Sequence, residues 1–150
     1  MFDKTDINII NQLVDNSRVP TTQIAKNTSI SNVATQQRIG KLEKAKVIKG
    51  YTAQLDYRQL GYKTTAYLGI FLEKAKNYND VIQELNKVEL ISEAHFTTGT
   101  YSIFAKIYAK DNLHLMEVLS ERIQSIDGIS RTETFISLHE GIHKGIRVDQ

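Results

Sequence analysis

The sequence has no cysteine and a single proline, Pro20, among its 150 residues. Without cysteine there is no disulfide framework, no thiolate metal site and no cysteine nucleophile. This absence suits a protein of a reducing compartment, and it excludes every function that depends on a thiol.

Long apolar runs are also missing. No stretch approaches the roughly 18 apolar residues of a membrane-spanning helix. The N-terminal run MFDKTDINII has acidic residues where a secretory signal would be basic. With 41% hydrophobic and 24% charged residues, the composition is that of an ordinary globular protein. We therefore expect a soluble, cytoplasmic protein with no membrane contact, built as one domain or two small ones.

Charge is distributed unevenly along the chain. Residues 1–62 carry nine Lys and Arg against five Asp and Glu, a net charge of +4, whereas residues 63–150 carry ten against twelve, a net charge of −2. The stretch Lys26–Lys49 holds six basic residues and one acidic residue, Glu43. Such a basic stripe is typical of a surface that binds a polyanion. A solvated helix face is the alternative that charge alone leaves open.

The first 45 residues predict three short helices. Asp3 can cap the first helix, with Asp6 in its opening turn, and Thr21 or Thr22 can cap a second helix at residues 23–27. After a tight connection, Ser31 caps a third helix that runs to about Ala45. Two helices joined by so short a turn, the second amphipathic and basic, are typical of a helix-turn-helix.

The third helix has an inner and an outer face. Thr35, Ile39 and Leu42 lie together at core spacing, so Thr35 is assigned to the core. Amides on the outer face can pair with adenine, an apolar group can touch a thymine methyl, and hydroxyls, helix N-termini and basic groups can meet phosphates. Gly40 is unusual inside a helix. The predicted DNA-binding residues are Thr22, Ser31, Asn32, Val33, Gln36, Gln37, Arg38, Lys41 and Lys44. A helical bundle used for protein contacts is the alternative.

The rest of the chain changes to period-two patterns. A short extended stretch, Val47–Leu55, leads into a polar link, and the order strand, helix, strand, strand, helix, strand follows, with a hairpin turn at Gly99-Thr100. This βαββαβ order is the ferredoxin-like arrangement. The predicted fold is α+β: a (winged) helix-turn-helix at residues 1–55, a linker at residues 56–63, and a ferredoxin-like domain at residues 64–150.

Several of these runs together resemble the Lrp/AsnC family of transcription regulators, over nearly the whole chain. The likeness is carried by DKTDINIINQLVDNSR, SISNVATQQRIGKLEKAKVIKGYTAQLD, QLGYKTTAYLGIFLEKAKNY, TTGTYSIFAKI and IQSIDGISRTET. Their combination is most similar to the asparagine-responsive branch of that family. The resemblance implies DNA binding by the first domain, and amino-acid sensing and assembly into dimers, often octamers, by the second.

The hydroxyl-rich hairpin turn around Gly99-Thr100 is the candidate site for the effector, the amino acid to which the regulator responds. Glycine leaves backbone N–H groups approachable, and flanking hydroxyls offer partners for the carboxylate and ammonium of an amino acid. An ordinary hairpin turn is the alternative from composition, whereas the resemblance implies that an amino acid binds near this hairpin, between dimers. Many family members have Asp at the position of Ser102. Members of the asparagine-responsive branch share this chain's departure from that pattern. The predicted effector-binding residues are Thr98, Gly99, Thr100, Tyr101, Ser102 and Gln124.

One motif points to an enzyme. HEGIH, from His139 to His143, matches the H-E-x-x-H signature of zinc peptidases, in which two histidines one helical turn apart bind the metal. It follows a predicted strand, however, and Gly141 and Gly145 each disfavour a helix there by about 1 kcal/mol. We therefore expect no catalytic residues and no metal. A regulator that answers to another amino acid, or to none, remains the alternative within the family.

Overall fold

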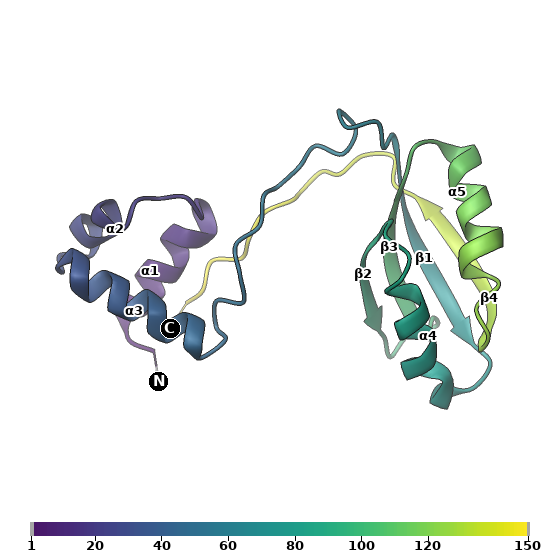
Figure 1. The fold of residues 1–150 in the computed structure, drawn as a ribbon, viewed down its shortest axis with the longest axis horizontal. Helices are drawn as coiled ribbons and strands as arrows, with labels where there is room; N and C mark the ends of the chain where they lie inside the picture. Colours follow the sequence, from purple (N-terminus) through teal and green to yellow (C-terminus); the bar gives the residue numbers. More distant parts are fainter. Residues whose placement is uncertain (1, 150) are drawn as a thin grey trace. The chain divides into compact units, whose positions relative to one another are not determined.

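The computed structural model of the chain describes residues 2–149. Its contacts divide the chain into two compact units (Figure 1). Residues 2–54 and 142–149 form the helical unit, and residues 55–141 form the sheet unit. The sequence-based division assigned residues 64–150 to one domain, whereas the structure groups the last of them with the helices, because they contact the first helix.

The helical unit contains α1 (Lys4–Asp15), α2 (Thr21–Thr28) and α3 (Asn32–Lys44). Asp3 caps α1 and shares a capping box with Asp6, and the Oγ of Ser31 caps α3 by accepting from the N–H of Ala34 at 3.1 Å. The predicted caps of α1 and α3 are confirmed.

The predicted start of α2 is wrong. The N-cap is Pro20, whose carbonyl oxygen accepts from the N–H groups of Gln23 and Ile24 at 2.9 and 3.1 Å. Proline suits this position because it has no N–H to satisfy and its φ, −60° here, is already set. Thr21 and Thr22 consequently lie in the first turn of the helix rather than capping it.

The core of the helical unit is small. Ile9, Ile24 and Leu42 from the three helices are buried together. Thr35 is also wholly buried and its hydroxyl donates to the carbonyl of Ser31 at 3.0 Å, which confirms its place on the inner face. After α3, residues 49–54 form no strand, so the described part of this unit has no β-strand wing.

The sheet unit has the predicted βαββαβ order. Its four strands form one antiparallel sheet in the order β2-β3-β1-β4, and its helices cover one face of that sheet (Figure 1). A π-helical turn, Leu119–Ile123, follows the second helix. The elements are β1 (Thr64–Leu72), α4 (Tyr78–Leu85), β2 (Ile91–Phe96), β3 (Ile103–Ala109), α5 (Asn112–Val118) and β4 (Ile129–Ile136).

The two faces of the sheet differ. On one face, β1 presents every second residue to the core: Ala66, Leu68 and Ile70 are fully buried beneath α4 and α5. On the opposite face the ring of Tyr67 stacks on that of Phe104, with 5.6 Å between ring centroids. Tyr101 crosses the same face over Gly69, where a Cβ atom would lie 2.4 Å from its ring. Glycine is therefore required for the aromatic ring to lie flat on the strand.

We predict that Gly69→Ala lowers the free energy of unfolding of the sheet unit by about 1–3 kcal/mol, because the added methyl group overpacks against Tyr101. Gly99→Ala is the matched control, since a Cβ there meets no atom within 4 Å, and it should change stability by less than about 0.5 kcal/mol. Urea unfolding without effector measures both. Equal stability of the two variants would contradict the close packing of Tyr101 on Gly69.

Candidate DNA interface and effector site

One exposed stripe of α3 carries five of the predicted DNA-binding side chains. Val33, Gln36, Gln37, Lys41 and Lys44 recur at helical spacing, and all are exposed, Val33 to 64%. The apolar group and the two amides occupy the N-terminal half of the stripe, and the ammonium groups occupy the C-terminal half. This order suits a helix that presents its first turns to base edges and its end to phosphates.

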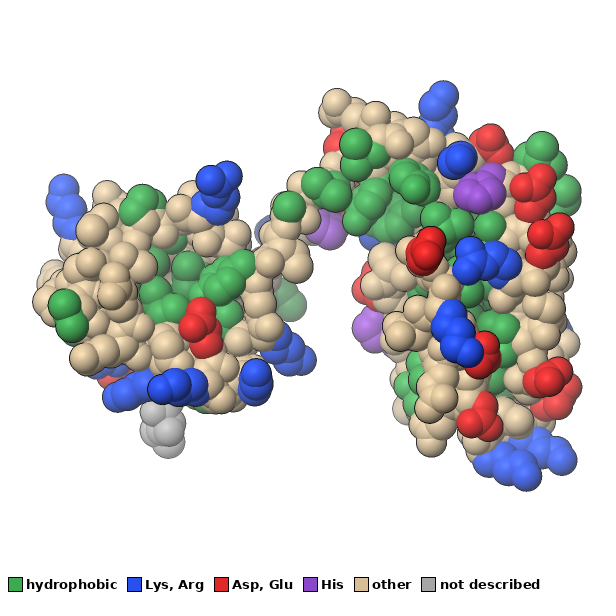
Figure 2. Space-filling model, in the orientation of Figure 1, with side chains coloured by type: hydrophobic (Ala, Val, Ile, Leu, Met, Phe, Trp, Pro, Cys, Tyr) green, Lys and Arg blue, Asp and Glu red, His purple; other side chains and the backbone are tan. Residues whose placement is uncertain are grey.

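The surroundings of this stripe are open and basic. Gly40 lies within it, and a Cβ there would meet no atom within 4 Å, so the glycine makes no close approach inside the chain. Lys26 and Lys46 are also exposed. Figure 2 shows Lys and Arg side chains gathered along the lower edge of the helical unit, where acidic side chains are few. The surface can attract a polyanion over more than one helix.

Thr22, Ser31 and Asn32, three of the predicted contacts, lie outside this stripe. Thr22 is exposed in the first turn of α2, and the Oγ of Ser31 already accepts a capping bond, which leaves its O–H to donate. Asn32 is half-buried, and its Oδ1 is buried with no hydrogen-bond partner among the described residues. A bidentate contact to adenine would require that amide to turn outward.

Arg38 has a role that the sequence did not indicate. Its guanidinium lies 2.8 Å from the carboxylate of Asp3 and 2.7 Å from that of Asp6. These are the two capping-box residues of α1, so Arg38 joins α3 to the N-terminus of α1. Its charge is compensated locally, and the structure therefore separates it from the exposed lysines with which it was predicted to bind phosphate.

The same cluster shifts two pKa values. The backbone N–H of Asp6, followed by the guanidinium of Arg38, holds the pKa of Asp3 below its usual range. Hydrogen bonds to the two carboxylates raise the pKa of Arg38. Because the pKa of Asp3 is lowered on folding, its contribution to stability is present above about pH 4 and is lost as the pH falls through the lowered value.

The candidate effector turn is wider than predicted. β2 ends at Phe96 and β3 begins at Ile103, and the closing bond runs from the N–H of Thr97 to the carbonyl of Ser102 at 3.0 Å. The predicted hairpin is confirmed, with Gly99 and Thr100 at its tip, but its connection spans residues 97–102 rather than two residues. A second bond, from the Thr97 hydroxyl to the carbonyl of Tyr101, lies within this connection. The turn presents Thr98, Gly99 and Thr100 exposed at its tip.

The other predicted effector residues lie near the C-terminal end of β1. The N–H of Ser102 donates to the carbonyl of Ile70, and the Nε2 of Gln124 donates at 3.0 Å to the hydroxyl of Thr132, which faces Ile70 across the sheet. Gln124 directly follows the π-helical turn, a feature often found at functional sites. The structure thus brings Gln124 and the turn to one end of the sheet.

Tyr101 belongs to the open sheet face. Its hydroxyl donates to Glu133 at 2.8 Å, which raises the pKa of Tyr101 and lowers that of Glu133. Its ring lies 6.0 Å from that of Phe104 and 5.9 Å from that of Phe135. Sequence reasoning missed this aromatic face, although the alternation of Tyr67, a glycine and Phe71 in β1 was a signal for it.

HEGIH does not form the arrangement that its letters suggest. Residues 139–143 are not helical, so the two imidazoles are not presented one turn apart on a helix. Glu140 lies 3.6 Å from the ammonium of Lys106 on the open sheet face. Among residues 2–149 there is no group of three His, Cys, Asp or Glu placed to hold a metal ion, and no helix long and apolar enough to cross a membrane.

A helix-turn-helix with an exposed basic stripe, followed by a ferredoxin-like domain, is the architecture of a DNA-binding regulator, and comparison with known families shows that class. Residues 2–49 match the winged helix-turn-helix DNA-binding family, and residues 65–145 match the Lrp/AsnC ligand binding domain. The chain belongs to the Lrp/AsnC family. It is a DNA-binding transcription regulator with an amino-acid-binding domain, and not an enzyme.

Similar proteins cover nearly the whole chain. The regulatory protein AsnC of Haemophilus influenzae is 37% identical over 146 residues, 97% of each chain. The solved structure of AsnC from Escherichia coli has a TM-score of 0.91 at 34% identity and covers 99% of each chain. A regulator from Neisseria meningitidis, solved as a complex with L-Met, has a TM-score of 0.91 at 21% identity over 96% of this chain and 94% of its own; at that identity it shows the fold alone.

We predict that Arg38→Gln lowers the melting temperature of the helical unit by about 3 °C at pH 7, because α3 loses its ion pairs with α1. It should also reduce the stability lost on acidification below pH 4, since Asp3 then has a less depressed pKa. Lys44→Gln, on the exposed stripe, is the control and should change neither quantity. An unchanged melting temperature with weakened DNA binding would instead favour the phosphate contact.

Proposed function

We propose that this regulator reads its operator with the exposed stripe of α3 and that the amino acid to which it responds is asparagine. The observation that carries the DNA-reading part is the shared exposure of Val33, Gln36 and Gln37 ahead of Lys41 and Lys44. Amides pair with adenine in the major groove, a branched methyl suits thymine, and lysines meet phosphates. Such a protein acts where the DNA is, which we take to be the cytoplasm.

The effector part of the proposal rests on the end of the sheet that carries both the turn, bonded to Ile70, and Gln124, bonded to Thr132. Thr98, Thr100 and the backbone N–H of Gly99 are exposed donors that suit a carboxylate. The side-chain amide of Gln124 offers both a donor and an acceptor to an amide ligand. Ser102 places a hydroxyl where an acidic residue is common in the family. Methionine, the ligand named in the Neisseria meningitidis complex, and an absent effector are the competing outcomes.

We infer that two copies associate through the open sheet face and that dimers assemble further, into octamers. Phe135 is 45% exposed there, beside Tyr67, Tyr101 and Phe104. Apolar rings on one face suit an isologous contact with the same face of a second copy. An amino acid that binds one assembly more tightly than another shifts the balance between them, and so changes which pairs of DNA-reading units are available.

The DNA-reading stripe predicts two kinds of mutant. Binding is measured to a duplex that the wild-type protein selects from random sequence and to random duplexes. Lys41→Gln should weaken binding to all of them and reduce the slope of log affinity against log salt by about 1. Gln36→Ala should weaken the selected duplex about tenfold and leave random duplexes unaffected. Fluorescence anisotropy over a salt series measures both. Affinity independent of salt would rule out the phosphate contacts.

The effector proposal predicts a selective thermal shift. Among the twenty amino acids, asparagine should raise the melting temperature most, since a ligand at 100 times its Kd stabilises the native state by about 2.7 kcal/mol. Gln124→Ala should reduce that shift, and Gln83→Ala, an exposed glutamine of α4, should not. Sedimentation should show a change of assembly at the same concentrations. An unchanged melting temperature with saturating asparagine would contradict asparagine as the effector, without affecting the DNA-binding part of the proposal.

A further inference from the structure

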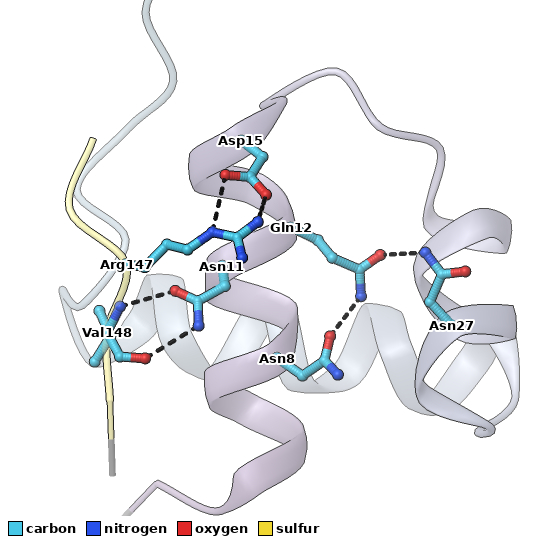
Figure 3. Close-up of polar contacts among 7 residues, drawn as sticks. All are labelled: Asn8, Asn11, Gln12, Asp15, Asn27, Arg147 and Val148. Atoms are coloured by element: carbon cyan, nitrogen blue, oxygen red, sulfur yellow. Dashed lines mark hydrogen bonds and ion pairs between the residues drawn. The ribbon is translucent and has the colours of Figure 1, made fainter. Parts of the chain in front are cut away.

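The last residues of the chain dock on α1. The side-chain amide of Asn11 binds both main-chain polar groups of Val148 (Figure 3). Its Nδ2 donates to the carbonyl oxygen at 3.0 Å, and its Oδ1 accepts from the N–H at 2.9 Å. A side-chain amide thereby pairs with the extended tail as a neighbouring strand would.

A second contact lies one helical turn further along α1. The carboxylate of Asp15 pairs with the guanidinium of Arg147, which donates from Nη2 and, at 3.4 Å, from Nε (Figure 3). Hydrogen bonding to Asp15 raises the pKa of Arg147. Because Asn11 and Asp15 are four residues apart on one face of the helix, they meet adjacent residues of the tail in a single register.

A third contact depends on shape. A Cβ atom added at Gly145 would lie 2.5 Å from Cγ1 of Val14 and 3.7 Å from its Cβ, so only glycine lets the tail lie this close to the helix. Polar, ionic and steric contacts therefore agree on one alignment of residues 145–148 along α1. Asn11, Val14 and Asp15, which we call the docking residues, are three and four residues apart, so the helix places them on one face.

The helix that receives the tail also positions the other two helices of the unit. Gln12 of α1 accepts from the amide of Asn27 of α2 at 2.7 Å (Figure 3). Asp3 and Asp6 hold Arg38 of α3. A contact that steadies α1 therefore also acts on α2 through Gln12, and on α3, the helix that carries the exposed stripe, through Asp3 and Asp6.

We propose that residues 145–148 are a latch, a segment of the chain's own C-terminus that binds the site formed by Asn11, Val14 and Asp15 and is needed for full DNA affinity. It rests on the proposed function only in taking α3 as the reading helix. The latch follows β4 of the amino-acid-binding domain in the chain, so that domain is joined to the helical unit both before β1 and after β4.

Hydrogen exchange tests the docking. In the full chain, Asn11→Ala should make the amides of α1 exchange about tenfold faster, while those of α4 in the sheet unit stay unchanged. Asn8→Ala is the matched control, because Asn8 lies on the same helix but bonds to Gln12 rather than to the tail (Figure 3). Equal exchange in the two variants would overturn the latch.

A disulfide tests which copy supplies the tail. The native chain has no cysteine, and the separation of 3.7 Å between the Cβ atoms at positions 14 and 145 is that of a disulfide. Mild oxidation of Val14→Cys/Gly145→Cys should give an intrachain cross-link, at least tenfold faster than in Val14→Cys/Gly141→Cys, where a Cβ at position 141 meets no atom within 4 Å. Interchain cross-links would show that a second copy supplies the tail, against the proposal, and equal rates would overturn the docking itself.

DNA affinity tests the consequence. For the duplex that the wild-type protein selects, Asn11→Ala should weaken binding at least threefold, and oxidising Val14→Cys/Gly145→Cys on that background should restore it, with loss again on reduction. Wild-type affinity for Asn11→Ala would refute the coupling. A wild-type protein that binds no duplex would refute the proposed function instead, and the exchange and cross-linking results would still decide the docking.

Discussion

Two carboxylates at the start of α1 hold the reading helix in place. With one oxygen each, the carboxylates of Asp3 and Asp6 satisfy backbone N–H groups at the start of the helix, and with the other they bind Arg38 of α3. This arrangement matters because the core of the helical unit is small, with Ile9, Ile24 and Leu42 as its large buried side chains. A small unit buries little apolar surface, so polar contacts between its helices add to the constraints that fix their arrangement.

The tail extends this logic. α1 is capped at one end by residues that hold α3, and along its length it binds α2 and residues 145–148. The lysines and amides of the exposed stripe of α3 face solvent, and the contact between α3 and the start of α1 is made by Arg38 instead. The sheet unit makes a similar division, with aliphatic side chains buried under α4 and α5 and aromatic rings on the opposite face over Gly69.

Most of the secondary structure could be predicted from local signals. Asp3 and Ser31 were recognisable as caps because their chemistry acts within three residues, and Thr35 was recognisable as core from helical spacing. Predicted boundaries were wrong where a local rule had a competitor. Pro20 displaced the threonines as the start of α2, and the turn after β2 closed through Thr97 and Ser102 rather than at its glycine.

The sequence by itself determined the βαββαβ order, the helix-turn-helix and the face of α3 that is exposed, because periodicity and capping depend on residues close together in the chain. Only the tertiary structure decided that Arg38 binds α1 and that residues 145–148 return to it. The partners in those contacts are separated along the sequence by between 32 and 137 positions. At such separations, the charge or shape of one residue does not identify the residue that it contacts. HEGIH is the converse case: its letters match a metal site, but the extended backbone between β4 and the docked tail presents them differently.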